Sequence, residues 1–280
     1  MNSADLHLHT NKSDGLLTPT ELVRLASENN LKAIAITDHD SIDGIQEALD
    51  AGSNFDLEVI PGIEFNTDAD NGELHMLGYF IDHHNEELVE FIKRLKTARF
   101  ERIKSMVEKL RGLGIEVSLE SILSKTEDKA ALGRPHIARA LVDMGYVESI
   151  KDAFNKYIGS GCPAYVARYK LKPSEAIEII KIAGGVPVLA HPGLLSSLLY
   201  IDMCIDEGIQ GIEVYHSKHT KLETEKFIRI AEEFSLIPTG GSDCHGECTA
   251  SGQYLIGTVT VSYDIVESLK SLSCINRKES

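Results

Sequence analysis

Residues 33–40 read AIAITDHD, an apolar run that is followed at once by four polar side chains. The apolar run predicts a short buried strand. Asp38, His39 and Asp40 are ionisable, and ionisable side chains directly after a buried strand are costly unless they face a cleft. We therefore predict that this strand ends at a functional site.

Strand and helix patterns alternate on both sides of this stretch. The tetrapeptide 18–21, TPTE, predicts a helix start, because it joins an N-cap Thr to Pro at the first helical position and to Glu three residues after the cap. Apolar runs predict further strands at 57–65, 74–80, 186–190, 211–215 and 237–239, and helical patterns occupy 42–51, 173–183, 221–234 and 266–272. This order favours an α/β fold with a parallel sheet, built from about seven strand–helix units.

Residues 86–164 show a different pattern. Apolar side chains keep helical spacing from Leu88 to Leu110, which predicts one helix of about 25 residues that ends at Gly112 and Gly114. Shorter helices are predicted at 119–124, 135–144 and 149–158, and no strand pattern occurs among them. We therefore expect an all-helical insertion, 86–164, between two parts of one domain, 1–85 and 165–280.

Composition limits the classes of function. The chain has 280 residues, with 28 basic and 43 acidic side chains and a net charge of −15, so it repels a phosphate backbone unless a local field reverses the sign. Its five cysteines form no CxxC pair, which favours a reducing cytoplasm. No apolar run reaches the roughly 18 residues of a membrane span, and the first residues lack a signal-peptide pattern. We expect a cytoplasmic protein with no membrane contact and no evident protein partner.

Nine side chains of metal-ligand type lie at or near the ends of the predicted strands. They are His7, His9, Asp14, His39, Glu64, His75, His191, Asp243 and His245. Residues 5–9, DLHLH, predict the end of a short strand, and alternate residues of a strand point the same way, so His7 and His9 can meet one ion. Mixed imidazole and carboxylate donors suit Zn, Mn or Fe rather than Ca. Nine donors exceed what one ion uses, which indicates a multinuclear site.

Individual members of this set also have simpler interpretations. Asp14 lies in a Ser-Asp-Gly turn and can serve the turn alone. Glu64 lies between Ile63 and Phe65 and can alternate outward on a half-exposed strand. His75, on a strand, can be a structural histidine of the core.

The motifs together resemble the PHP (polymerase and histidinol phosphatase) family of metal-dependent phosphoesterases. The matching segments are DLHLHTNKSDG at 5–15, ITDHDSIDG at 36–44, PGIEF at 61–65, HMLGYFID at 75–82, AHPG at 190–193 and GSDCHG at 241–246. The resemblance implies a distorted seven-stranded (β/α) barrel, here with an inserted all-helical subdomain. It also implies a trinuclear metal site at the carboxyl ends of the strands.

The resemblance assigns each ligand to an ion. His7, His9, Glu64 and Asp243 would hold the first ion. Glu64 would bridge to the second, which His75 and His191 would also hold, and Asp14, His39 and His245 would hold the third. The cofactors implied are three divalent ions, Mn, Fe or Zn. Asp14 stands where some members of the family carry His.

The insertion resembles that of the small stand-alone members, through the segment GRPHIA at 133–138 and a long helix with Arg99 and Arg102. Those members include 3′,5′-nucleoside bisphosphate phosphatases and a 5′→3′ exonuclease that acts on short RNA. The implied partner is a small phosphorylated nucleotide. The favoured function is hydrolysis of the 3′-phosphate of a nucleoside 3′,5′-bisphosphate. The alternatives are a 5′→3′ exonuclease on short RNA or DNA and, more remotely, a non-catalytic scaffold stabilised by metal.

Substrate residues are predicted in two places. Arg134 and His136 open a helix, where backbone N–H groups, guanidinium and imidazole together can bind an anion, although a plain helix start is the alternative. Arg99 lies beside the apolar stripe of the long helix and is the member of its basic face that we expect to meet substrate, the alternative being a solvated face. His216 follows the strand GIEVY, and we predict that it is a leaving-group acid or a substrate contact.

Overall fold

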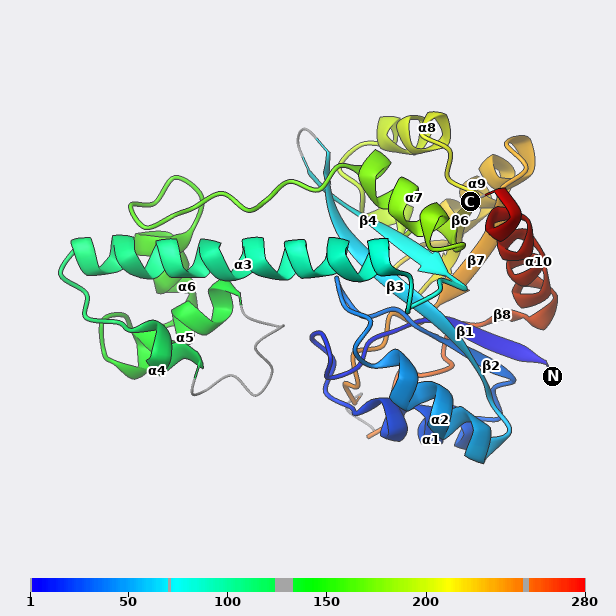
Figure 1. Ribbon diagram of the computed structural model, residues 1–280, viewed down its shortest axis with the longest axis horizontal. Coiled ribbons are helices and arrows are strands. Elements are labelled where there is room, and N and C mark those ends of the chain that lie inside the picture. The colour runs from blue at the N-terminus through cyan, green and yellow to red at the C-terminus, as the bar shows by residue number, and fades with distance from the viewer. Residues whose placement is uncertain (1, 70–71, 124–132, 249–251, 280) are drawn as a thin grey trace. The chain divides into compact units, whose positions relative to one another are not determined.

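The computed structural model describes residues 2–69, 72–123, 133–248 and 252–279, drawn in colour in Figure 1. The chain divides into two compact units. The barrel unit comprises residues 1–91 and 170–280, and the helical unit comprises residues 92–169. The boundary at residue 91 falls inside a long helix, α3 (Glu86–Gly112), a few residues after the expected start of the insertion.

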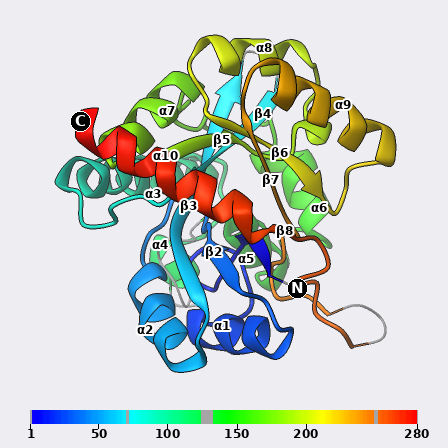
Figure 2. The ribbon, with the colours of Figure 1, turned by 90° about the vertical axis from the view of Figure 1, so that its right-hand side faces the viewer.

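One sheet of eight strands forms the barrel unit, in the order β7-β6-β5-β4-β3-β2-β1-β8. The strands are β1 (Ser3–Leu8), β2 (Ala33–Ile36), β3 (Glu58–Ala69), β4 (Gly72–Tyr79), β5 (Val186–Leu189), β6 (Gly211–His216), β7 (Ile237–Gly241) and β8 (Val261–Ser262). Beyond β7, the amide of Asp243 donates to the His7 carbonyl, and the amide of His9 donates to the Cys244 carbonyl, each at 3.0 Å. These bonds nearly close the barrel (Figure 2), and the expected α/β barrel is confirmed.

Two strands depart from the expected parallel order. β4 pairs antiparallel with both β3 and β5. Only residues 70 and 71 separate β3 from β4, and a parallel crossover needs a dozen residues or more, so the chain must return as a hairpin. The short strand β8 lies antiparallel beside β1 and was not predicted.

Helices surround the sheet at the positions that the sequence patterns predict. Two further elements between β5 and β6 were not predicted. The helices are α1 (Pro19–Glu28), α2 (Ile45–Phe55), α7 (Pro173–Ile182), α8 (Leu199–Asp206), α9 (Lys221–Glu233) and α10 (Tyr263–Glu279), with a 3₁₀ turn, η3, at Pro192–Leu194. Thr18 and Glu21 form the predicted capping box of α1. The two elements that were not predicted are η3 and α8.

Helix α10 covers the end of the barrel at which the parallel strands begin. Val266 and Leu269 of α10 pack in one buried cluster with Ala4 of β1, Ala33 of β2 and Val186 of β5. Figure 2 shows α10 crossing in front of the sheet at this end. The apolar plug leaves the polar side chains to the opposite end, where the parallel strands finish.

The helical unit has a core of its own. After α3 it contains α4 (Leu119–Leu123), α5 (Arg134–Asp143), α6 (Ile150–Ala153) and a π-helical turn, η2 (Phe154–Ile158). Ile103 and Leu110 of α3 pack in one buried cluster with Ile137 and Leu141 of α5. Ser124, the last residue of one predicted helix, lies outside the described residues. In the described part of the chain, every helix is too short or too polar to cross a membrane.

Candidate metal centre

The carboxyl ends of the parallel strands gather all nine predicted ligands. His7 lies in β1, and His9 follows it. His39 follows β2, His191 follows β5, and Asp243 and His245 follow β7. His75 lies in the first half of β4, which reaches the same end of the sheet because β4 runs in the opposite direction. Strand direction therefore explains why this one histidine precedes, rather than follows, its apolar run.

Glu64 lies at the centre of these side chains and is 1% exposed. Its backbone is held by the segment after β2, because the Glu64 amide donates to the Asp38 carbonyl at 3.2 Å and the Asp40 amide donates to the Glu64 carbonyl at 2.9 Å. This pairing turns the Glu64 side chain inward. The alternative that Glu64 alternates outward is therefore wrong.

The two oxygens of Glu64 face different histidines. Oε1 lies 2.9 Å from His75 Nδ1 and 3.0 Å from His191 Nε2. Oε2 lies 3.2 Å from His7 Nε2, 3.3 Å from His9 Nε2 and 3.2 Å from His39 Nδ1. One carboxylate thus offers one oxygen to each of two groups of imidazoles, as a bridging ligand would.

The group around Asp243 has the spacing of ligands about one ion. Asp243 Oδ1 lies 3.5 Å from His7 Nε2 and 3.3 Å from His9 Nε2. Ligand atoms at metal–nitrogen distances near 2.1 Å stand about 3.4 Å apart when they surround one ion tetrahedrally. The observed separations of these atoms, and of the Glu64 Oε2 contacts, therefore fit a shared ion.

A looser group forms around Asp14. Asp14 Oδ1 lies 3.4 Å from His245 Nε2 and 3.8 Å from His9 Nδ1, and Oδ2 lies 3.9 Å from His39 Nε2. Asp14 is 55% exposed, so it forms the open edge of the cluster. Each of the groups His9–Asp14–His39–His245, His7–His9–Asp243 and His39–Glu64–His75 has ligand atoms that all lie within 4.8 Å of one another.

Several buried nitrogens of the cluster have no hydrogen-bond partner among the described residues. They are both ring nitrogens of His9, Nδ1 of His39 and Nδ1 of His191. The Nε2 atom of His9 lies close to two carboxylate oxygens but without hydrogen-bond geometry. Buried polar atoms are costly when unpaired, so converging imidazole and carboxylate lone pairs fit divalent cations of the Zn, Mn or Fe type.

The electrostatics of the ion-free cluster follow from its carboxylates. Burial alone would lower the pKa of His9, but Asp243 and Glu64 raise it to about 9. Burial opposes the charged form of His7 too, yet Glu213 and Glu64 raise its pKa well above the usual value. The pKa of His39 is lowered to about 4, chiefly by burial. Protons thus occupy part of the cluster when cations do not.

Two further buried aspartates shape the loops that carry ligands. Asp38 accepts hydrogen bonds from the Thr10 amide at 2.7 Å and from the Ser13 hydroxyl at 2.6 Å, in the turn that leads to Asp14. Asp5 accepts from the Ser242 amide at 2.9 Å, next to Asp243. The position of Asp38 after a buried strand signalled a functional role. The role of Asp5 had no signal, because it depends on contacts with residues more than 200 positions away.

The predicted substrate residues lie in both units. His216 ends β6, is 5% exposed, and its Nε2 lies 3.3 Å from Asp243 Oδ2, so it borders the cluster. In the helical unit, the Arg134 guanidinium stacks over the Phe154 ring at 5.3 Å, and His136 Nδ1 accepts from the Gly133 amide at 3.2 Å. Arg99 lies in α3. That these four residues meet substrate stays a prediction.

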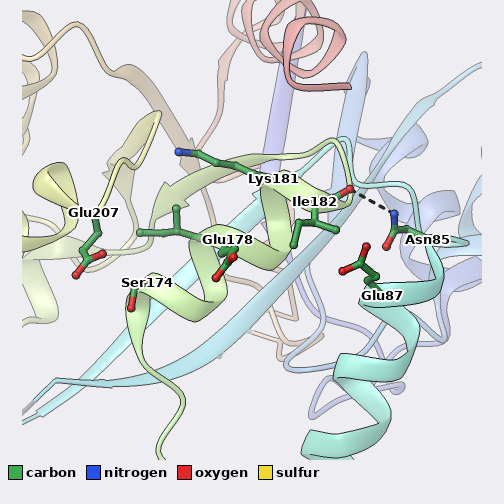
Figure 3. Close-up of a pocket in the computed structure, with 8 residues that line it drawn as sticks. Asn85, Glu87, Ser174, Glu178, Lys181, Ile182 and Glu207 are labelled. Atoms are coloured by element: carbon green, nitrogen blue, oxygen red, sulfur yellow. Dashed lines mark hydrogen bonds between the residues drawn. The ribbon is translucent and has the colours of Figure 1, made fainter. Parts of the chain in front are cut away.

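A hollow without histidines lies beside α7 in the barrel unit (Figure 3). Three of its lining residues are carboxylates, Glu87, Glu178 and Glu207. The Asn85 side chain beside them donates to the Ile182 carbonyl at 3.3 Å. None of the lining residues belongs to the histidine cluster. Its lining has three carboxylates against one cation, Lys181, and no imidazole that could hold a metal ion, so the strand-end cluster is the better candidate for phosphate chemistry.

Comparison with known proteins supports this choice. The model of the PHP domain matches residues 5–130. A 3′,5′-nucleoside bisphosphate phosphatase from Chromobacterium violaceum is 33% identical over 251 residues, which are 88% of this chain and 88% of that protein. A 5′-3′ exoribonuclease from Haemophilus influenzae is 33% identical over 250 residues, which are 87% of this chain and 90% of that protein.

A solved structure agrees with the sequence relatives. The Bifidobacterium adolescentis protein, whose description proposes a metal-dependent phosphoesterase, has a TM-score of 0.78 at 32% identity, and the match covers 96% of each chain. These similarities span the barrel unit and the helical unit alike. The chain belongs to the PHP family of metal-dependent phosphoesterases.

Proposed function

We propose that this phosphoesterase removes the 3′-phosphate from nucleoside 3′,5′-bisphosphates at a centre of three divalent ions. The observation that carries the catalytic part is the environment of Glu64, whose two oxygens each face a separate group of imidazoles. The substrate class is supported by the similarity to the Chromobacterium violaceum phosphatase over most of both chains.

The proposed ligand sets are those that the resemblance to the PHP family implies, and short distances within the sets support them. His7, His9, Glu64 and Asp243 hold one ion, and Glu64, His75 and His191 hold the second. Asp14, His39 and His245 hold the third. Divalent ions, when bound to this donor set, supply positive charge for a phosphate and activate water for its hydrolysis. The three carboxylates offset only part of that charge, so an anionic substrate is attracted to a protein whose net charge is −15.

His216 is the proposed acid for the leaving group. Its Nδ1 accepts a hydrogen bond from the Lys218 amide at 3.2 Å, which leaves the ring proton on Nε2. Nε2 is the nitrogen that faces Asp243. A proton is therefore held on the side of the ring that borders the ligands, where a departing oxygen needs it.

Arg99, Arg134 and His136 are the proposed contacts for the phosphate that does not react. Burial lowers the pKa of Arg102, and the positive charges of Arg134, Arg168 and Arg99 lower it further. Guanidinium groups therefore gather within the helical unit. Such a gathering is repulsive by itself and favours binding of a phosphate.

A 5′→3′ exonuclease activity on short RNA is the second candidate. Its specific support is the Haemophilus influenzae exoribonuclease, which matches this chain at the same identity as the phosphatase. Both candidates use the same ligand cluster and expel the same 3′-oxygen, so they differ in whether the reacting phosphate is a monoester or a diester and in substrate length.

We also propose a cytoplasmic location. It is supported by the five cysteines, all in the described part of the chain, which are free thiols.

One assay separates these functions. Purified protein with Mn²⁺ is given adenosine 3′,5′-bisphosphate, a short 5′-phosphorylated RNA and histidinol phosphate, and the release of phosphate and of mononucleotides is measured. We expect the highest kcat/KM with the bisphosphate and release of phosphate only. Faster release of mononucleotides from RNA would support the exonuclease instead. No hydrolysis of any of them would support the scaffold and overturn the proposed function.

A further inference from the structure

We propose that Glu213 is a positioning residue that orients two histidines of the proposed metal centre, His7 and His191. Glu213 lies in β6 and is 0% exposed. One oxygen of its carboxylate faces the His7 ring, and the other faces the backbone amide of His191. The inference rests on the proposed function only in so far as these histidines bind metal.

The first contact determines which nitrogen of His7 is free to bind. Glu213 Oε1 lies 2.9 Å from His7 Nδ1, and His7 Nε2 points the other way, toward Glu64 Oε2 at 3.2 Å. A carboxylate accepts hydrogen bonds only, so it keeps a proton on Nδ1. The lone pair of a neutral His7 is then on Nε2, which faces the remaining ligands. A carboxylate on the far nitrogen also makes the imidazole a stronger donor to a cation.

The second contact holds the backbone of His191. Glu213 Oε2 accepts a hydrogen bond from the His191 amide at 2.7 Å. His191 has φ 25° and ψ 61°, outside the usual regions for a residue with a side chain, and it precedes Pro192, which restricts it further. Such a conformation persists only where its surroundings enforce it. Through this conformation the His191 ring reaches Glu64, at 3.0 Å from Nε2 to Oε1.

Both partners of Glu213 are donors, and this decides what can replace it. Glutamine has nearly the same shape but only one acceptor atom, so its NH₂ group must face either the His7 ring or the His191 amide. Facing the ring, it favours the tautomer with the proton on Nε2, which cannot bind a cation. Facing the amide, the NH₂ group sets its own N–H against the His191 N–H, which removes the hydrogen bond that holds the strained backbone. A residue that merely fills space would tolerate this substitution.

The test compares metal binding by the wild-type protein with that by Glu213→Gln. Each protein is freed of metal and titrated with Zn²⁺ against a competing chelator, and bound zinc is counted by mass spectrometry. We expect at least one site to weaken by about 10- to 100-fold, the usual effect of losing a carboxylate behind a histidine ligand. Glu58→Gln is the matched control, because the Glu58 carboxylate also accepts hydrogen bonds from two side chains, Tyr263 and Lys270, but lies outside the ligand groups.

Each outcome bears on a separate claim. Wild-type zinc affinity in Glu213→Gln would overturn the role of Glu213 and leave the metal centre intact. A wild-type protein that binds no zinc would overturn the metal centre itself. If Glu213→Gln does not fold, Glu213→Asp replaces it, because a side chain one methylene shorter cannot span both contacts, and unchanged affinity in that variant would also overturn the proposal.

A second measurement reports the tautomer directly. The ¹⁵N spectrum of the zinc-loaded wild-type protein should show a proton on His7 Nδ1 and none on Nε2. A His7 that binds zinc through Nδ1 would contradict the proposal, whatever the affinities are.

Discussion

Asp38 holds Thr10 with both of its oxygens, since Oδ1 accepts the Thr10 amide and Oδ2 accepts the Thr10 hydroxyl, each at 2.7 Å. The Ser13 hydroxyl reaches Oδ1 at 2.6 Å. The end of β2 thereby fixes the turn that leads from His9 to Asp14. Asp38, which stands out in the sequence because it follows a buried strand, thus stabilises the conformation of the loop that carries Asp14.

Replacing Asp38, the clamp on this turn, should lower the stability of the loop and weaken binding of the ion that Asp14 is proposed to hold. In Asp38→Ala, both acceptors are lost, and the buried Thr10 amide, which can only donate, loses the oxygen that accepts from it. We expect a loss of about 1–3 kcal/mol in the free energy of unfolding of the metal-free protein, the usual cost of an unsatisfied buried donor. Denaturant unfolding measures it, and unchanged stability with unchanged metal content would contradict the clamp.

Removing the proposed bridge should affect more than one ion. Glu64→Gln loses the charge that faces five imidazoles, so we expect two metal equivalents to be lost and activity to fall further than in any variant of a single-ion ligand. His75→Asn is the comparison, because the His75 ring is hydrogen-bonded to one Glu64 oxygen, Oε1, and its loss should cost one ion. Metal analysis after gel filtration checks both. Two well-ordered neighbouring ions in Glu64→Gln would exclude the bridging role.

Metal affinity should rise with pH. In the ion-free protein the pKa of His9 is raised to about 9, and that of His7 is raised as well. Both rings are therefore protonated near neutral pH and must release protons to bind a cation, so protons compete with the metal. We expect the apparent affinity for Zn²⁺ or Mn²⁺ to increase from pH 6 to pH 9. Calorimetry in two buffers of different ionisation enthalpy measures the protons released, and a value of zero would refute the prediction.

The preference for a substrate with a second phosphate should depend on Arg134. If this guanidinium holds the phosphate that does not react, Arg134→Ala should lower kcat/KM for a nucleoside bisphosphate by about 10- to 150-fold, the value of a lost charged hydrogen bond. An aryl phosphate has no second phosphate and should change little. Arg139→Ala, an exposed arginine of the same helix, is the control. Equal losses on both substrates would show that Arg134 serves the reacting phosphate or the fold.

The local elements could be predicted from the sequence, because short-range patterns decide them. The apolar run before Asp38 predicted the buried strand β2, and the capping box at Thr18 placed the start of α1. Helical spacing from Leu88 to Leu110 predicted α3. The alternation of His7 and His9 predicted that both rings point one way, and both lie beside Asp243.

Which side chains meet could not be predicted from the sequence, because those contacts depend on how distant strands pair in the folded chain. The direction of β4 brings His75 to the ligand end, and pairing with the segment after β2 turns Glu64 inward. Closure between β1 and the segment after β7 sets His7 beside Asp243. In the sequence, nothing distinguishes Glu213 from any other acidic residue of a predicted strand. Its hydrogen bond to the His191 amide forms because β6 pairs with β5, and its hydrogen bond to the His7 ring forms because the barrel curves back toward β1.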